Sequence, residues 1–217
     1  MTMTAFVDFL IFYLGFVVLL TFHEFAHAWV ALKCGDDTAQ SQGRVSLNPI
    51  VHLDMIGTVV MPLVGFVLAA TGSGLAGFVI GWAKPVPVNI HNLRQPRLDD
   101  TLIAIAGPMM NLLLAAVLVG LIKLGVVADL PILAKMCHGL AVQSLLLCFF
   151  NLLPFPPLDG SHVVKNLVGM SYETYWKLCQ YGFIIVIVAW QIPAVPNLVY
   201  RMTKGTFAIF AGLAVLR

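Results

Sequence analysis

The chain has 217 residues, of which 60% are hydrophobic and only 10% are charged, and its mean hydropathy is +0.94. This composition is far from that of ordinary soluble domains and is typical of a polytopic membrane protein. The net charge of +2 is small and dispersed along the chain, so nothing in it indicates a nucleic-acid-binding protein. We therefore expect one integral membrane domain over residues 1–217, surrounded by a lipid bilayer.

The first apolar segment, about residues 5–31, contains the sequence HEFAH at residues 23–27. The chain before it has no Lys or Arg, unlike the basic start of a secretory signal, so we interpret the segment as a retained first membrane crossing. Positions four apart lie on one face of a helix, so His23 and His27 can bind one zinc ion, and Glu24 can act on water at that ion.

The apolar surroundings of HEFAH make a chance motif on a soluble helix a poor explanation. Ionisable side chains are costly at membrane depth, and a His-Glu-His set there indicates a functional site. The sequence therefore predicts a hydrolytic metal centre on the first crossing.

Further apolar segments follow along the chain, at about residues 55–70, 102–127, 132–153 and 178–199, with a short patch at 207–216. Segments of this length and composition are typical of membrane-spanning helices. They predict an all-α polytopic membrane protein with about five to six transmembrane helices.

Two polar connections, residues 33–54 and 84–100, carry a modest excess of basic residues. The positive-inside rule places the second in the cytosol and favours the same side for the first. The segment between them is too short for two full helices, which need about 40 residues. We expect one helix followed by an extended return over residues 74–82 or, alternatively, a shallow re-entrant helix.

Proline alternates with valine over residues 84–88, which excludes a helix and suits either an edge strand or a stiff loop. The whole region from residue 55 to 89 is therefore expected to form a short membrane-associated β-hairpin or a re-entrant segment.

Asp159 is the best candidate for the third protein ligand that a zinc ion on two histidines needs. It follows the proline-rich run at residues 154–157, which ends the fourth segment, and it precedes Gly160. Irregular backbone at a membrane boundary is tolerated only where protein or a cavity satisfies it. We expect Asp159 to meet the histidine pair from a separate segment.

Three other polar residues keep more than one interpretation. Gly107-Pro108 and Asn111 stand near the start of the third segment, where a proline in the first turn is tolerated. Asn111 is either a contact between helices or part of the chemistry. His52 is a packing group, a partner of a metal ligand or a pH-sensitive loop contact. His162 is a structural contact on the cytosolic side or a neighbour of the site.

The motifs HEFAH, GPMMN and NLLPFPPLDG, in this order, resemble the site-2 protease family of intramembrane zinc metalloproteases. The runs GRVSLNPIVHLDMIGT and GWAKPVPVN resemble its compact bacterial and archaeal members, without a PDZ or CBS domain. The resemblance implies that His23, His27 and Asp159 bind one Zn²⁺ per chain. It also implies that Glu24 is the general base and that Asn151 lies near the developing oxyanion.

The function implied is that of a zinc-dependent intramembrane endopeptidase, which hydrolyses peptide bonds within or near transmembrane segments of single-pass membrane-protein substrates. The expected location is the prokaryotic cytoplasmic membrane, with the active site toward the cytosol. The alternative is a non-catalytic membrane zinc-binding protein or transporter, because polar residues inside a bundle also mark ion pathways. Glu24 argues against that alternative, since a storage or transport site needs no unligated carboxylate beside its metal.

Overall fold

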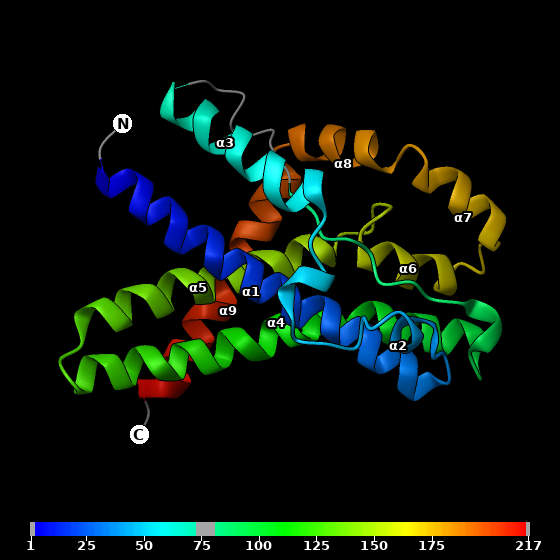
Figure 1. Ribbon diagram of the computed structural model, residues 1–217, viewed down its shortest axis with the longest axis horizontal. Coiled ribbons are helices and arrows are strands. Elements are labelled where there is room, and N and C mark those ends of the chain that lie inside the picture. The colour runs from blue at the N-terminus through cyan, green and yellow to red at the C-terminus, as the bar shows by residue number, and fades with distance from the viewer. Residues whose placement is uncertain (1–2, 73–80, 216–217) are drawn as a thin grey trace.

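The computed structural model describes residues 3–72 and 81–215, and all regular elements within these ranges are helices (Figure 1). The all-α prediction is confirmed. By length and composition, three of the described helices are able to span a membrane, or four if one bent helix pair is a single span. This number is smaller than the predicted five to six, because the second apolar segment is too short and the last two segments belong to one bent pair.

The centre of the molecule is formed by three long helices: α1 (Met3–Cys34), α4 (Pro96–Val127) and α5 (Pro131–Asn151). α4 packs against both α1 and α5 (Figure 1). Small residues such as Ala28, Ala115 and Ala141 are fully buried in these contacts. Lipid gives helices no hydrophobic reason to associate, so close packing of small residues holds such a bundle together.

α4 begins earlier than the sequence predicted, and this changes the place of Pro108. Pro96 starts the helix, and the Asp99 carboxylate accepts a hydrogen bond from the backbone N–H of Gln95. Pro108 is therefore inside the helix and not in its first turn. Proline has no N–H to donate to the carbonyl of Ala104, so one bond of the helical ladder is missing here.

A short membrane segment follows the first polar connection. Asp54 accepts hydrogen bonds from the N–H groups of Ile56 and Gly57 and so begins η2 (Met55–Val60), a π-helical turn that continues into α3 (Met61–Ala70). Most of the expected extended return over residues 74–82 lies outside the described residues. Residues 81–89 are neither helix nor strand, and they pair as a strand with no described part of the chain.

The two ends of this membrane segment lie next to each other. The N–H of Trp82 donates to the carbonyl of Gly57, and the N–H of Lys84 donates to the carbonyl of His52, at 3.2 and 3.0 Å. A segment whose two ends are hydrogen-bonded to each other has both ends on the same side of the bilayer.

The two polar connections are also fastened together. They contain α2 (Thr38–Ser41), η1 (Pro49–Val51) and η4 (Ile90–Asn92). The fully buried Asp36 accepts a hydrogen bond from the N–H of Asn89, at 2.7 Å. These contacts place both connections on one side of the membrane, as the excess of basic residues predicted.

The chain after α5 forms four helices: α6 (Asp159–Leu167), α7 (Tyr172–Cys179), α8 (Gly182–Gln191) and α9 (Ala194–Val215). α8 and α9 meet at an angle of 81°. The prediction of one segment over residues 178–199 and a separate patch at 207–216 is wrong. Pro193 breaks the helix inside the first of these ranges, and the patch is the second half of α9.

Candidate metal centre

The α1 helix brings His23 and His27 together one turn apart, as the spacing predicted. Their rings stand edge to face with centroids 4.6 Å apart, and their Nε2 atoms are 3.0 Å from each other. Both residues and Glu24 are buried, each with at most 8% of its surface exposed. The three ionisable side chains thus lie inside the bundle, on a helix that is apolar enough to span a membrane.

Asp159 joins the two histidines from the first position of α6. Its Oδ2 atom is 3.2 Å from His23 Nε2 and 3.4 Å from His27 Nε2. Gly160 permits this approach, because a Cβ at that position would lie 2.2 Å from the carbonyl oxygen of Leu152. The proline-rich turn after α5 and the following glycine therefore carry the carboxylate back to α1.

The three residues fit a zinc ion. In tetrahedral coordination with bonds of about 2.0–2.1 Å, neighbouring ligand atoms are roughly 3.3 Å apart, and the distances here are 3.0 to 3.4 Å. Two imidazoles and one carboxylate are also a donor set that zinc prefers. Asp159 Oδ2 is buried and receives no well-aligned hydrogen bond from the described residues, so a ligand atom is left for a cation.

Asp159 is held in the ionised form that a metal requires. Burial on its own raises the pKa of this carboxyl group, but the adjacent His27 and His23 hold it below its usual value. The side chain is therefore an anion in the position where the two Nε2 atoms converge.

The α4 helix covers the other side of the histidine pair. His27 Nδ1 is 2.7 Å from the carbonyl oxygen of Ile103, and His23 Nδ1 is 3.1 Å from the side-chain amide of Asn111. Between them, Gly107 lies directly against the rings, since a Cβ there would be 2.3 Å from His27 Nε2. The sequence analysis did not place Gly107 at the centre. Its spacing of four from Asn111, matching that of the histidines, is the signal that was available.

The other sequence-predicted residues lie elsewhere. Asn151, at the end of α5, donates a hydrogen bond to the carbonyl oxygen of Leu147 in its own helix, so its role at the oxyanion stays a prediction. His52 is 1% exposed and its Nε2 contacts the carbonyl of Ser46, which makes it a loop-packing group. His162 contacts Asp100 at 3.1 Å and so links α6 to α4.

Arg44 is a buried residue that the sequence analysis did not single out. It is 4% exposed, and its Nη2 donates a hydrogen bond to the carbonyl oxygen of Lys84. This guanidinium therefore joins the two polar connections. Only the three-dimensional contact reveals it, because Arg44 and Lys84 are on different segments.

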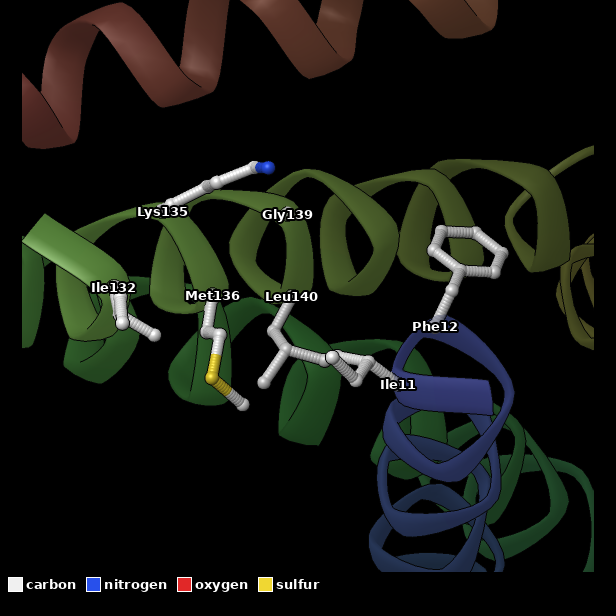
Figure 2. Close-up of a pocket in the computed structure, with 7 residues that line it drawn as sticks. All are labelled: Ile11, Phe12, Ile132, Lys135, Met136, Gly139 and Leu140. Atoms are coloured by element: carbon white, nitrogen blue, oxygen red, sulfur yellow. The ribbon is translucent and has the colours of Figure 1, made fainter. Parts of the chain in front are cut away.

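An apolar hollow of about 360 Å³ between α1 and α5 is separate from this centre (Figure 2). Figure 2 shows Ile11 and Phe12 of α1 facing side chains of α5 that include Met136 and Leu140. Residue 12 precedes His23 by three helical turns, which is roughly 16 Å along the axis. The hollow therefore has no part in the chemistry of the histidine pair.

Comparison with known proteins agrees with this geometry. The profile of peptidase family M50 matches residues 11–131 and 125–189. The chain is 40% identical over 185 residues to "Putative zinc metalloprotease YwhC" of Bacillus subtilis, which covers 82% of this chain and 78% of that protein. It is 29% identical over 206 residues to "Putative zinc metalloprotease Rip2" of Mycolicibacterium smegmatis, covering 92% and 73%. No solved structure matches.

The matched residues contain the whole candidate centre, from His23 and Glu24 on α1 to Asp159 on α6. HEFAH lies on a helix that is apolar enough to span a membrane, and a carboxylate reaches it from a second segment. Both features agree with the family assignment. The chain is an integral membrane metalloendopeptidase and belongs to peptidase family M50, the site-2 protease family.

Proposed function

We propose that the chain is a zinc-dependent intramembrane endopeptidase that hydrolyses peptide bonds within or near transmembrane segments of single-pass membrane proteins. One zinc ion per chain would be held by His23, His27 and Asp159. The observation that carries the proposal is the convergence of two buried histidines and the partly buried Asp159, with the buried Glu24 on the same helix as the histidines, in an apolar helical bundle. The zinc metalloprotease names of the relatives support the choice of metal.

The bound zinc ion supplies Lewis-acid chemistry, which makes water acidic near neutral pH and polarises a peptide carbonyl. Glu24 takes the proton from the attacking water and gives it to the leaving amine. Glu24 directly follows His23 on α1, so its carboxylate is near the proposed metal ligands, but Glu24 is not one of these ligands. Asn151 is proposed to donate to the oxyanion with one N–H of its side-chain amide, while the other N–H is bonded to the carbonyl of Leu147.

The substrate helix must be unwound locally before hydrolysis, because its carbonyls are in its own hydrogen bonds. The proposed substrates are therefore membrane proteins whose crossing segment contains residues with low helix propensity near one end. Residues 81–89 have no regular secondary structure and are tethered to the first polar connection through Arg44, and we propose them as backbone that could receive the unwound substrate.

We propose the prokaryotic cytoplasmic membrane as the location, with the centre toward the cytosol. The polar connections on the side of Asp159 carry several basic residues, among them Arg44, Lys84, Arg94 and Arg97. Basic residues are enriched in cytoplasmic loops.

The decisive experiment compares the wild-type protein with Glu24→Gln in cells that co-express a panel of single-pass membrane proteins. Glu24→Gln keeps all three metal ligands, so we expect full zinc content in the purified variant and loss of cleavage. Glu173→Gln, on the exposed face of α7, is the matched control and should cleave normally. Cleavage by Glu24→Gln would contradict the assignment of the base. Zinc retention by the wild-type protein without cleavage of any panel member would favour a metal-binding protein or transporter.

A further inference from the structure

One face of α4 presents three consecutive contacts to the histidine pair. Ile103, Gly107 and Asn111 are each four residues apart, so they lie in a row along that face. The carbonyl of Ile103 meets Nδ1 of His27, Gly107 lies against both rings, and the amide of Asn111 meets Nδ1 of His23. Each histidine thus has a partner from α4 on the ring nitrogen that points away from Asp159.

We propose that Asn111 is a positioning residue: its side-chain oxygen accepts a hydrogen bond from Nδ1–H of His23 and so directs the Nε2 lone pair of His23 toward the metal. This inference rests on the proposed zinc function. Asn111 would then be the hydrogen-bond acceptor for His23 Nδ1–H, as the carbonyl of Ile103 is for His27 Nδ1–H. A neutral imidazole has one protonated nitrogen, and the partner of that nitrogen decides which of the two is free for a metal.

The orientation of the amide follows from this requirement. The amide nitrogen of Asn111 lies 3.1 Å from His23 Nδ1, and the amide oxygen is buried without a donor among the described residues. Nitrogen and oxygen of an amide are assigned from the hydrogen-bond network. When Nε2 of His23 is a ligand, Nδ1 carries the proton, and two donors would then face each other. Turning the amide by 180° gives this proton an acceptor.

The position of Asn111 is fixed by the surrounding helices. It is 0% exposed, and its backbone carbonyl accepts a hydrogen bond of 2.7 Å from Ser144 Oγ of α5. The missing N–H of Pro108 loosens the ladder one turn earlier, so this additional bond helps to hold the turn in place. Packing between helices alone does not require a polar side chain at this position. A polar side chain that is held beside His23 Nδ1 therefore points to a role in orienting that ring.

The rival explanation is that Asn111 only packs α4 against α1. Three variants separate the two explanations. Asn111→Leu keeps the approximate size of the side chain and removes the acceptor, and Asn111→Asp keeps an acceptor at the same place. Gln143→Leu is the matched control, because Gln143 is also a buried amide that joins α5 to α1, through the carbonyl of Phe12, but lies away from the histidines.

The test measures the zinc dissociation constant of the full-length protein in detergent by competition with a chelator, together with the thermal unfolding midpoint. Loss of such a partner typically weakens metal binding about 10- to 100-fold. We expect that loss for Asn111→Leu, wild-type affinity within about threefold for Asn111→Asp, and no change for Gln143→Leu. Asn111→Ala is the second acceptor-free variant if the leucine variant does not fold.

Wild-type zinc affinity in both acceptor-free variants would overturn the inference, and so would an equal loss in Asn111→Asp and Asn111→Leu. In either case zinc binding and Glu24-dependent cleavage by the wild-type protein would leave the proposed function intact. Absence of zinc binding by the wild-type protein would instead overturn the proposed function and this inference together.

Discussion

Gly107 of α4 lies directly against the rings of His23 and His27. We expect Gly107→Ala to weaken zinc binding at least about tenfold, because the new Cβ would overlap the space of His27 Nε2 and His23 Cε1 and push both rings aside. Alanine is favoured over glycine in a helix by about 1 kcal/mol, so loss of helix stability would not explain such a result. Zinc affinity would be measured by chelator competition.

Gly120→Ala is the control for this substitution, since it is in the same helix and a Cβ there would meet no atom of the described residues within 4 Å. Normal zinc affinity in Gly107→Ala would show that the rings have room to move, and the close packing would then have no role in the metal centre.

Asn151 is predicted to act on the transition state and not on the metal. Removal of one oxyanion donor typically lowers kcat by about 10²- to 10³-fold, and we expect this range for Asn151→Ala with unchanged zinc content. The assay is cleavage of a membrane substrate in detergent or vesicles. Because Asn151 caps its own helix through Leu147, the unfolding midpoint must be recorded as well. Unchanged turnover would reduce Asn151 to a structural amide.

Sequence alone predicted the histidine pair because its geometry is local: a spacing of four on a helix determines which side chains meet. Asp159 was also predictable, from prolines that end a crossing and a glycine that permits a close return. Arg44 and Gly107 were not, because their importance depends on which other segment lies against them. No pattern within their own segments carries that information.

At the scale of elements, α6 is held to α4 by a buried polar cluster. Asp100 of α4 contacts Lys165 at 2.8 Å and also His162 and Asn166, while Asp159 begins the same helix. Asp100 and Lys165 are each at most 6% exposed. The cluster therefore holds α6 against α4 and helps to fix the position of Asp159 at its start.

We expect Asp100→Leu to destabilise the protein by about 3–5 kcal/mol and to weaken zinc binding, because it leaves the Lys165 ammonium buried without its partner. The double variant Asp100→Leu, Lys165→Leu should recover much of the lost stability, since no unpaired charge remains. Denaturant unfolding and zinc affinity are the measurements. Glu173→Ala breaks the exposed pair with Lys177 and should change neither. A single variant as stable as the wild type would show that the cluster does not anchor α6.

The boundaries of elements were predicted less well than their existence. The apolar pattern located α1 and α5 to within a few residues, because a bilayer requires long apolar stretches. It gave a late start for α4, since the polar first turns around Asp99 and Asp100 look like a loop until their partners are known. It also missed the bend at Pro193, because apolar residues continue on both sides of it.

At the scale of the whole molecule, the described helices alternate between two ends. The polar connections, α6 and α7 share one end, through contacts such as Asn89 with Asp36 and His162 with Asp100. The turn between α4 and α5 lies at the other end (Figure 1). Phe207 of α9 packs against His138 near the start of α5, so the last helix also runs toward that second end.

This arrangement predicts the labelling pattern of single cysteines placed at exposed positions in a background without the four native cysteines. Gln42→Cys, His91→Cys and Lys177→Cys are at the end of the polar connections, and Ala128→Cys is at the opposite end. With the centre toward the cytosol, a membrane-impermeant maleimide should label only Ala128→Cys in intact spheroplasts and the other three in inverted vesicles. The reason is that Gln42 and His91 belong to the two polar connections, which hydrogen bonds of Arg44 and Asp36 hold together. Labelling of Gln42→Cys and His91→Cys from different sides would contradict the placement of both polar connections on one side of the membrane, whereas a full reversal would contradict only the orientation.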